Sequence, residues 1–225
     1  IRTAVIPPDG HMFAIADYSA IEARLTAWFC NEKWRQDVFA TTGKIYEASA
    51  AQMFHVPIES VTKGSDLRKK GKVAELALGY GGGVSALERM GGADMGLSED
   101  EMQDIVNKWR LASPNIKKMW YRVQDAAYTA VRERKRVSVV HGVSYFYSSG
   151  ILFAELPSGR RLAYVRPKLK KGRYGDELTY EGYGSDQDGK QTKKWCRQKT
   201  WGGKLFENLI PVSYTHLTLP TTPYV

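Results

Sequence analysis

Residues 17–24 carry two carboxylates at a spacing that could organise a metal site. Asp17 stands where an apolar run ends, and Glu22 follows within the first turns of a predicted helix. An Asp at the exit of a buried strand can hold a hard divalent cation at the floor of a cleft, and Glu22 lies near enough to shape the same cleft. An Asp and a Glu at a helix start are more often only a cap and a partner for the helix dipole. Metal binding is therefore the minority interpretation of this segment alone.

A second segment places charged and aromatic residues at helical spacing. Arg68, Lys72, Leu76 and Tyr80 recur every four residues. At about 3.6 residues per turn these positions form one slowly drifting stripe on a helix. Two cations then lead into an apolar and aromatic surface, which suits a nucleotide with its phosphates at Arg68 and Lys72. An amphipathic helix with a basic start gives the same pattern more often. The glycines at 81–83 follow the helix and lack the Gly-Lys-Ser/Thr ending of a phosphate-binding loop.

The periodicity of apolar residues predicts the helices that position these two segments. The run 11–16 follows a turn with proline and glycine, and it predicts a buried strand that delivers Asp17 at its end. Spacings of three and four predict helices at about 20–30, 32–41, 44–55, 66–79, 98–111 and 115–135. Ser98 with Glu101 matches a capping box, and Pro114 suits the first turn of a helix.

From position 137 onward the pattern changes to that of strands. Strands are predicted at 137–140, 143–153 and 161–165, separated by turns that contain glycine. The stretch 166–198 is polar, charged and rich in glycine, and we expect it to be an inserted hairpin or a mobile loop. A last helix is expected to begin near Lys204 and to break off after Ile210.

Composition and charge narrow the class of protein. The chain has 225 residues, 43% of them hydrophobic, which is enough for a folded body of one or two domains. It has no apolar run near the roughly 20 residues of a membrane span and no signal-peptide pattern, so we expect a soluble, intracellular protein. Cys30 and Cys196 are far apart, which predicts plain thiols.

The net charge of +9 is unevenly distributed. Residues 108–136 carry nine cationic and two anionic side chains, whereas residues 91–107 carry five acids and no base. Basic stretches beside an acidic one suit a protein that holds a polyanion on one surface and metal ions on another. Solvated helix faces account for such runs about as often, so the charge pattern alone does not decide.

Taken together, the two segments resemble the first two nucleotide-binding motifs of family A (polymerase I-like) DNA polymerases. The first family motif is Asp-Tyr-Ser followed by Ile-Glu and an Arg, all present at 17–24. The second has an Arg, a Lys four residues later, and a final Tyr-Gly, matched by Arg68, Lys72, Tyr80 and Gly81. The resemblance covers residues 1–210, and the stretches 156–161 and 200–204 look most like bacteriophage or prophage members.

The resemblance implies a template-directed DNA polymerase. Such an enzyme transfers a nucleotide from a dNTP to a primer 3′-hydroxyl, with primer-template DNA as partner and Mg²⁺ as cofactor, here in the cytoplasm of a bacterial host cell. By that resemblance Asp17 would bind two catalytic Mg²⁺ ions, with the backbone carbonyl of Tyr18 as a further ligand. Glu22 would be the steric gate in the space of a ribose 2′-hydroxyl.

The same resemblance assigns the remaining site residues. Arg68 and Lys72 would grip the triphosphate, and Lys72 would also donate a proton to pyrophosphate. Leu76 would face the sugar, and Tyr80 would stack near the templating base. The nucleic-acid contacts expected from the motifs are those of Arg24, Tyr80 and Gly81.

The implied fold is α+β, a partial palm with an antiparallel sheet and a helical fingers domain. Residues 1–60 would belong to the palm and carry the first metal-binding motif, and 61–136 would form the fingers helices. Residues 137–210 would supply palm-side strands, the inserted loop and the start of a helix. Residues 211–225 resemble the in-frame translation of a transposase adapter used in sequencing libraries, so we expect an artefactual tail on an incomplete fragment.

The chain departs from the family pattern in three places. Leu76 stands where well-known members carry Phe or Tyr, and Tyr46 stands where many cellular members have a phosphate-contacting His. The third motif, a His-Asp-Glu that supplies the second metal-binding Asp, is absent: no acid follows His141, and Asp186 with Asp188 suits a turn. Because one Asp does not readily hold two dications, we expect no polymerase activity from the chain as written.

Three other hypotheses stay open. A single-subunit RNA polymerase shares the general plan, but a gate carboxylate such as Glu22 makes sense only where ribonucleotides must be excluded. A non-enzymatic nucleic-acid-binding module would explain the basic stretch 108–136. A degraded prophage remnant is the third. The pattern predicts no oligomeric state.

Overall fold

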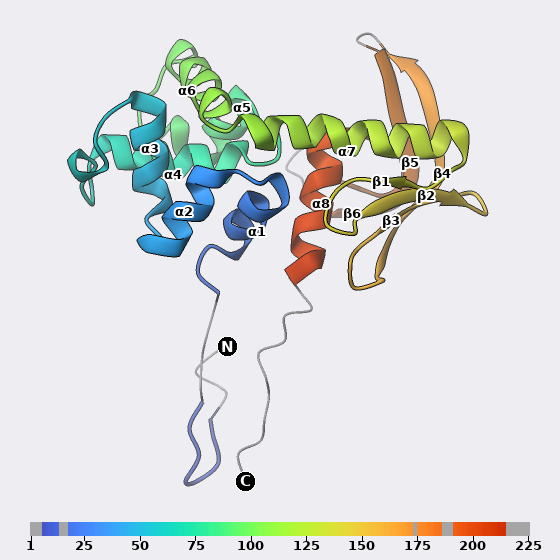
Figure 1. The fold of residues 1–225 in the computed structure, drawn as a ribbon, viewed down its shortest axis with the longest axis horizontal. Helices are drawn as coiled ribbons and strands as arrows, with labels where there is room; N and C mark the ends of the chain where they lie inside the picture. The colour runs from blue at the N-terminus through green and yellow to red at the C-terminus, as the bar shows by residue number, and fades with distance from the viewer. Residues whose placement is uncertain (1–5, 14–17, 173–174, 186–190, 215–225) are drawn as a thin grey trace.

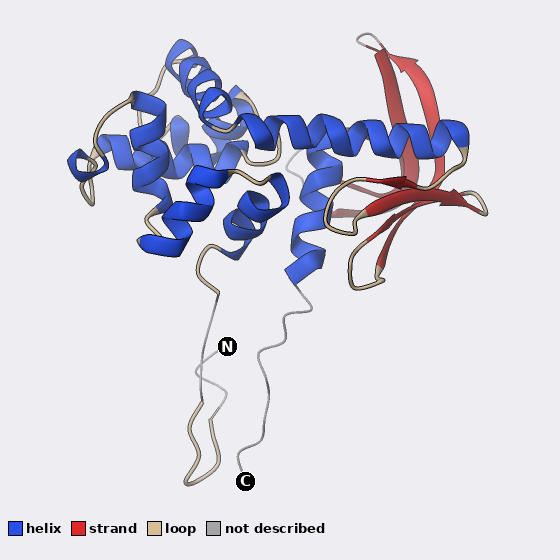
Figure 2. Ribbon diagram, in the orientation of Figure 1, coloured by secondary structure: helices blue, strands red, loops and turns tan. Residues whose placement is uncertain are grey.

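The computed structural model describes residues 6–13, 18–172, 175–185 and 191–214. Within these residues a group of short helices is followed by an antiparallel sheet, which is the α+β fold that the resemblance implied (Figures 1 and 2). The long helix α7 (Pro114–Glu133) joins the two halves, and α8 (Gly202–Tyr214) returns from the sheet to pack against α7.

The predicted helices are confirmed to within about two residues. They are α1 (Ile21–Cys30), α2 (Lys33–Thr41), α3 (Ile45–Phe54), α4 (Asp66–Leu78), α6 (Glu99–Ala112) and α7. The capping box at Ser98 and Glu101 is present, and Pro114 opens α7. Three further helical turns were not predicted, because a single turn has too few residues to show a period: η2 (Ile58–Ser60), α5 (Val84–Leu87) and η3 (Glu88–Gly92).

The sheet is a meander in which each described strand pairs antiparallel with the next. Its strands are β1 (Val137–Ser138), β2 (Ser144–Ser148), β3 (Ile151–Glu155), β4 (Arg161–Gly172), β5 (Gly175–Ser185) and β6 (Gln191–Thr200). The predicted strand 143–153 is two strands, joined by Ser149 and Gly150, which both have positive φ. That two-residue turn matches the right-handed twist of a hairpin.

The described residues of 166–198 form strands, so the expectation of a hairpin is confirmed and that of a mobile loop is wrong for these residues. That the hairpin is an insertion stays a prediction. β4 continues to Gly172, and β5 and β6 pair along most of their length. A register shift between Val165 and Lys168 reverses the face on which side chains lie. This bulge breaks the alternation of period two that would have predicted a strand.

Helix α8 is longer than expected. It begins at Gly202 and continues through Pro211 to Tyr214, so the prediction of a break after Ile210 is wrong. Proline lacks an amide hydrogen and usually ends a helix. Here the Ser213 hydroxyl donates to the Leu209 carbonyl at 2.7 Å and thereby supports the turn that contains the proline.

The buried strand predicted at 11–16 is wrong for the residues that are described. Positions 11–13 form no strand, and the side chains of Met12 and Phe13 are 90% and 51% exposed. Positions 14–17 lie outside the described residues. The described strands all lie between Val137 and Thr200 and pair with one another. A buried strand needs a neighbour to satisfy its backbone groups, and none of these serves that role for 11–13.

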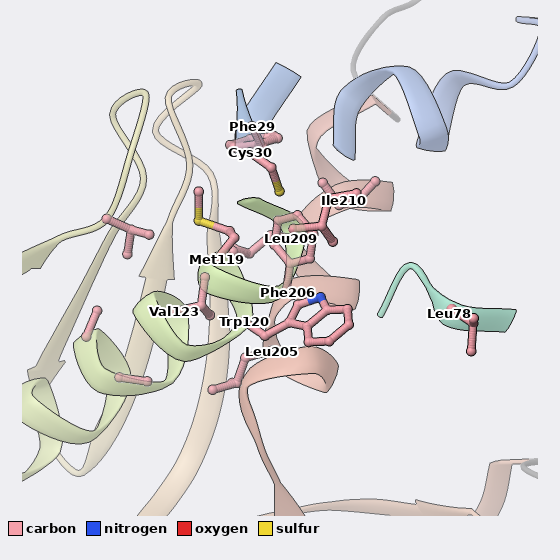
Figure 3. Packing of buried hydrophobic residues seen from close by; sticks show 14 of the residues in the cluster. Phe29, Cys30, Leu78, Met119, Trp120, Val123, Leu205, Phe206, Leu209 and Ile210 are labelled. Atoms are coloured by element: carbon pink, nitrogen blue, oxygen red, sulfur yellow. The ribbon is translucent and has the colours of Figure 1, made fainter. Parts of the chain in front are cut away.

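The core is continuous through α1, α7 and α8 (Figure 3). Phe206 and Leu209 of α8 lie against Met119 and Trp120 of α7, and all four are at most 6% exposed. Phe29 of α1 packs into the same cluster. Close packing of this kind fixes α1 relative to α7, and so it fixes one wall of the site described below.

Gly202 marks the closest approach between α8 and α7. A β-carbon at Gly202 would lie 2.0 Å from the Trp120 carbonyl oxygen. We expect Gly202→Ala to lower the free energy of unfolding by about 1–3 kcal/mol in urea denaturation, since the backbones must separate. Gly83→Ala is the matched control, because no atom lies within 4 Å of a β-carbon there. Equal effects of the two substitutions would contradict this account of the contact.

Candidate nucleotide-binding site

A pocket of about 370 Å³ unites four of the predicted site residues. Tyr18 and Glu22 line it from the first motif, and Leu76 and Tyr80 line it from the second. Glu22 at the start of α1 and Tyr80 just after α4 meet at this pocket, which brings the two motifs together. The structure thus joins segments that are far apart in the sequence into one concave surface.

Glu22 and Tyr80 contact each other directly across the pocket. The Tyr80 hydroxyl donates a hydrogen bond to Glu22 Oε2 at 3.2 Å. Burial, and then the negative charge of Glu22, raise the pKa of Tyr80 well above its usual value. The phenol therefore stays protonated and remains a donor, and the hydrogen bond holds the Glu22 carboxylate at the mouth of the pocket.

Tyr80 occupies the turn directly after α4, which ends at Leu78. Gly81 has φ of +81°, and a β-carbon there would lie 2.3 Å from the Trp201 ring. Only glycine fits both the left-handed backbone and this close contact. Gly81 therefore fixes the turn that follows Tyr80 and its close contact with Trp201. The predicted contacts of Tyr80 and Gly81 with nucleic acid stay predictions.

Arg68 lies beside the pocket without lining it. Its Nε forms an ion pair with Glu47 Oε1 of α3 at 2.6 Å, and its guanidinium lies 5.6 Å from the centre of the Tyr46 ring. Burial alone would raise the pKa of Glu47, but the hydrogen bond and charge of Arg68 lower it overall. The pair stays ionised near neutral pH and fixes Arg68 next to Tyr46, which does line the pocket.

Lys72 and Arg24 are both exposed and lie outside the pocket lining. Lys72 is on α4, one turn before Leu76. Arg24 donates to the Ser19 carbonyl at 3.0 Å, and its guanidinium lies 4.6 Å from the centre of the Phe39 ring. These contacts give Arg24 a local structural role. Asp17 lies outside the described residues.

The floor of the pocket contains a buried ion pair that the sequence did not reveal. Arg35 of α2 and Glu75 of α4 line the pocket and join through two hydrogen bonds of 2.5 and 2.8 Å, with side chains only 2% and 5% exposed. Arg35 also donates to Ser113 Oγ at 2.8 Å, and the Trp109 indole donates to Glu75 at 2.9 Å. The signal was Glu75 itself, an acid in the otherwise apolar run 73–78.

This ion pair fixes the position of α4 relative to α2. Burial makes the charges costly unless both are paired and hydrogen-bonded. Glu75 accepts from Arg35 and Trp109, and Arg35 donates to Glu75 and Ser113, although the buried Nε of Arg35 has no partner among the described residues. Because Glu75 and Leu76 are neighbours on α4, anchoring Glu75 also fixes the residues of α4 that face the pocket. The arrangement suits a rigid helix that presents Leu76 and Tyr80 to a bound molecule.

The basic stretch 108–136 is divided between structural contacts and a free surface. Arg110 donates to the Gly82 carbonyl at 3.1 Å, and Arg132 pairs with Asp176 at 2.8 Å. In contrast, Lys117, Lys118 and Arg122 of α7 are exposed. Fewer cations of this stretch are therefore available to a ligand than the charge pattern suggested.

The sequence model for DNA polymerase family A matches residues 1–141. The chain belongs to this family. The matched range contains both motifs and the whole pocket lining, so the site described above is the part of the chain that the family model covers.

Individual family A polymerases show how much of such a protein this chain represents. The DNA polymerase of Bacillus phage SP02 is 57% identical over 212 residues, which are 93% of this chain and 32% of that protein. DNA polymerase I of Pseudomonas aeruginosa is 29% identical over 116 residues, 52% of this chain and 12% of that protein. The chain thus spans about a third of the phage relative's length.

A solved family A structure shows a weak overall likeness. The POL domain of Pol1 from M. smegmatis, in complex with DNA primer-template and dNTP, has a TM-score of 0.45 and 20% identity, covering 66% of this chain and 21% of that chain.

In the part of our structure that is described, no helix is both long and apolar enough to cross a membrane.

Proposed function

We propose that the chain is the nucleotide-binding part of a template-directed DNA polymerase that adds dNTPs to a primer 3′-hydroxyl. The observation that carries the proposal is the shared pocket, in which Tyr18 and Glu22 of one motif meet Leu76 and Tyr80 of the other. Primer-template DNA is its proposed partner, and the cytoplasm of a bacterial host cell is its proposed location. Family membership favours this activity over that of an RNA polymerase.

The residues of the chain would divide the work of holding a dNTP. Leu76 is 50% exposed and offers an apolar surface to the sugar, with Glu22 held opposite by Tyr80. Lys72, one turn earlier on α4, and Arg68 beyond it would bind the phosphates. This order places the cations at one end of the nucleotide and the aromatic ring of Tyr80 at the other.

The donor set fits Mg²⁺, which proteins usually bind through one or two carboxylates together with phosphates of the substrate. Asp17 and the Tyr18 carbonyl would supply the oxygens of the chain, and Tyr18 already lines the pocket. When bound, Mg²⁺ would activate the primer hydroxyl and neutralise charge on the leaving pyrophosphate. We propose that the chain alone does not catalyse polymerisation, because no His-Asp-Glu motif in it supplies a second metal-binding Asp.

The proposed role of Glu22 predicts a change in sugar selectivity. We expect Glu22→Ala to raise the affinity for ATP relative to dATP at least about tenfold, because space opens where the 2′-hydroxyl lies. Calorimetric titration of the chain with each nucleotide and Mg²⁺ measures this ratio. Glu22→Gln keeps the bulk of the side chain and should keep the ratio. An unchanged ratio in Glu22→Ala would rule out the gate role.

A nucleic-acid-binding module without nucleotide chemistry is the second candidate. The exposed cations of α7, Lys117, Lys118 and Arg122, favour it. This candidate predicts salt-dependent DNA binding that survives Asp17→Asn and does not respond to dNTP. Saturable binding of Mg²⁺-dATP, lost on removal of Lys72, would exclude it.

A further inference from the structure

Strands β4, β5 and β6 present one face away from α7. On β5, Asp176 pairs with Arg132 of α7 at 2.8 Å, and the Leu178 amide donates to the Tyr128 hydroxyl of α7. Side chains alternate along a strand, so the odd-numbered residues of β5 lie on the opposite side. Figure 1 shows α7 running across β4 and β5. The face turned away from α7 is called the open sheet face below.

The open sheet face is cationic. Its charged members follow from the cross-strand register and the ion pairs around Glu181: Arg166, Lys168, Lys170, Glu177, Glu181, Arg197 and Lys199. Among the described side chains, five cations thus face two carboxylates, a surplus of three positive charges.

The ion pairs of this face leave most of its cations accessible. Glu181 is shared by Arg166 and Arg197, and Glu177 pairs with Lys199. The side chains of Arg166 and Lys199 are still 72% and 73% exposed. Lys168 and Lys170 are exposed and form no ion pair with the described residues, so two charges are fully available to an anion.

Two large aromatic rings continue the same face. Tyr183 of β5 and Trp195 of β6 are cross-strand partners with ring centres 5.2 Å apart and planes at 87°. They are 55% and 53% exposed. Exposed rings beside cations are the combination with which single-stranded nucleic acid is bound, since bases stack on the rings and phosphates contact the cations. A duplex keeps its bases stacked on one another and gains nothing from the rings.

We infer that the open sheet face binds a single-stranded segment of DNA. From Glu177 to Tyr183 the face extends roughly 20 Å along β5, with cations at one end and rings at the other. The inference rests on the proposed function, because it assigns the unpaired part of the DNA partner to a surface. This surface lies beyond the residues 1–141 that the family model matches.

The salt dependence of binding tests the cationic end. A labelled single strand of roughly 16 nucleotides, the upper end of known site sizes, is titrated with the chain by fluorescence anisotropy. For Lys168→Glu/Lys170→Glu we expect affinity to fall at least about tenfold at low salt. The slope of log affinity against log salt should shrink by roughly 1.4, since each phosphate contact on a single strand contributes about 0.7. Binding equal to that of the unaltered chain would overturn the inference.

Lys44→Glu/Lys63→Glu is the matched charge control, since neither lysine forms an ion pair with the described residues. It makes the same change in net charge at two exposed lysines of the helical half. We expect its affinity to stay within about twofold and its salt slope to stay unchanged, because neither lysine lies on the open sheet face. A loss as large as that of Lys168→Glu/Lys170→Glu would overturn the inference, since net charge alone would then explain it.

The aromatic end has its own test. Tyr183→Ser/Trp195→Ser should weaken single-strand binding about tenfold without altering the salt slope, and should leave binding of a blunt duplex unchanged. An equal loss for both forms of DNA would overturn the stacking role. Titration of the same variants with Mg²⁺-dATP separates the two proposals: absent nucleotide binding in the unaltered chain refutes the proposed function, whereas the DNA titrations decide this inference.

Discussion

Arg35→Met should lower the free energy of unfolding by about 3–5 kcal/mol, the largest effect on stability that we expect from one substitution in this chain. The change leaves the Glu75 carboxylate buried at 5% exposure without its bidentate partner. Removing one member of a buried ion pair costs far more than the pair itself contributes, since the remaining charge stays out of water. Urea denaturation followed by tryptophan fluorescence gives the difference.

Two variants separate this effect from ordinary loss of packing. Arg35→Met/Glu75→Gln removes both charges but keeps an oxygen that can accept from the Trp109 indole, so it should be more stable than Arg35→Met by about 2 kcal/mol or more. Arg132→Met breaks a pair whose arginine is 52% exposed and should cost less than about 1 kcal/mol. An equal cost for Arg35→Met and Arg132→Met would refute the buried-charge explanation.

Lys72→Ala should weaken binding of Mg²⁺-dATP by about 10–100-fold. A charge-assisted contact to phosphate contributes about 1.5–3 kcal/mol, and Lys72 is the exposed cation of α4 nearest to Leu76 along the predicted stripe. Calorimetric titration of the chain measures the change. Lys72→Arg keeps the charge and should recover most of the affinity.

Lys69→Ala provides the comparison on the same helix. Lys69 is also exposed but pairs with Asp66 at 2.9 Å, away from the stripe. We expect its loss to change dATP affinity less than about twofold. If both alanine variants weakened binding equally, general electrostatic attraction would explain the result and Lys72 would lose its assigned contact.

Elements in which apolar residues repeat at one spacing over several turns could be predicted from the sequence. Elements that depend on contacts between residues far apart in the sequence could not. Helices α6 and α7 repeat an apolar spacing over several turns, and their start signals at Ser98 and Pro114 are local. The first part of β4 was predicted at 161–165, but its continuation to Gly172 was not, because a bulge after Val165 reverses the alternation. The bounds of β5 and β6 were not predicted either. This region is stabilised by hydrogen bonds between neighbouring strands, and the residues of one strand do not indicate which strand it will pair with.

The candidate site shows the same division. Glu22, Leu76 and Tyr80 could be selected from motif spacing, and the structure brings them into one pocket. Glu75 stands out as an acid in an apolar run, but the ion pair itself could not be predicted, since Arg35 lies 40 positions away in the sequence. The assignments of Asp17, Lys72 and Arg24 to metal, phosphate and DNA stay predictions.

The buried ion pair beneath the pocket also limits how the protein can move. Arg35 and Glu75 tie α2 to α4, and their bonds to Ser113 and Trp109 tie both helices to α6 and the start of α7. Rotating α4 alone would separate two charges whose side chains are only 2% and 5% exposed, which is strongly unfavourable. Any closing motion over a nucleotide must therefore carry these helices as one rigid block, with its hinges in the segments outside them.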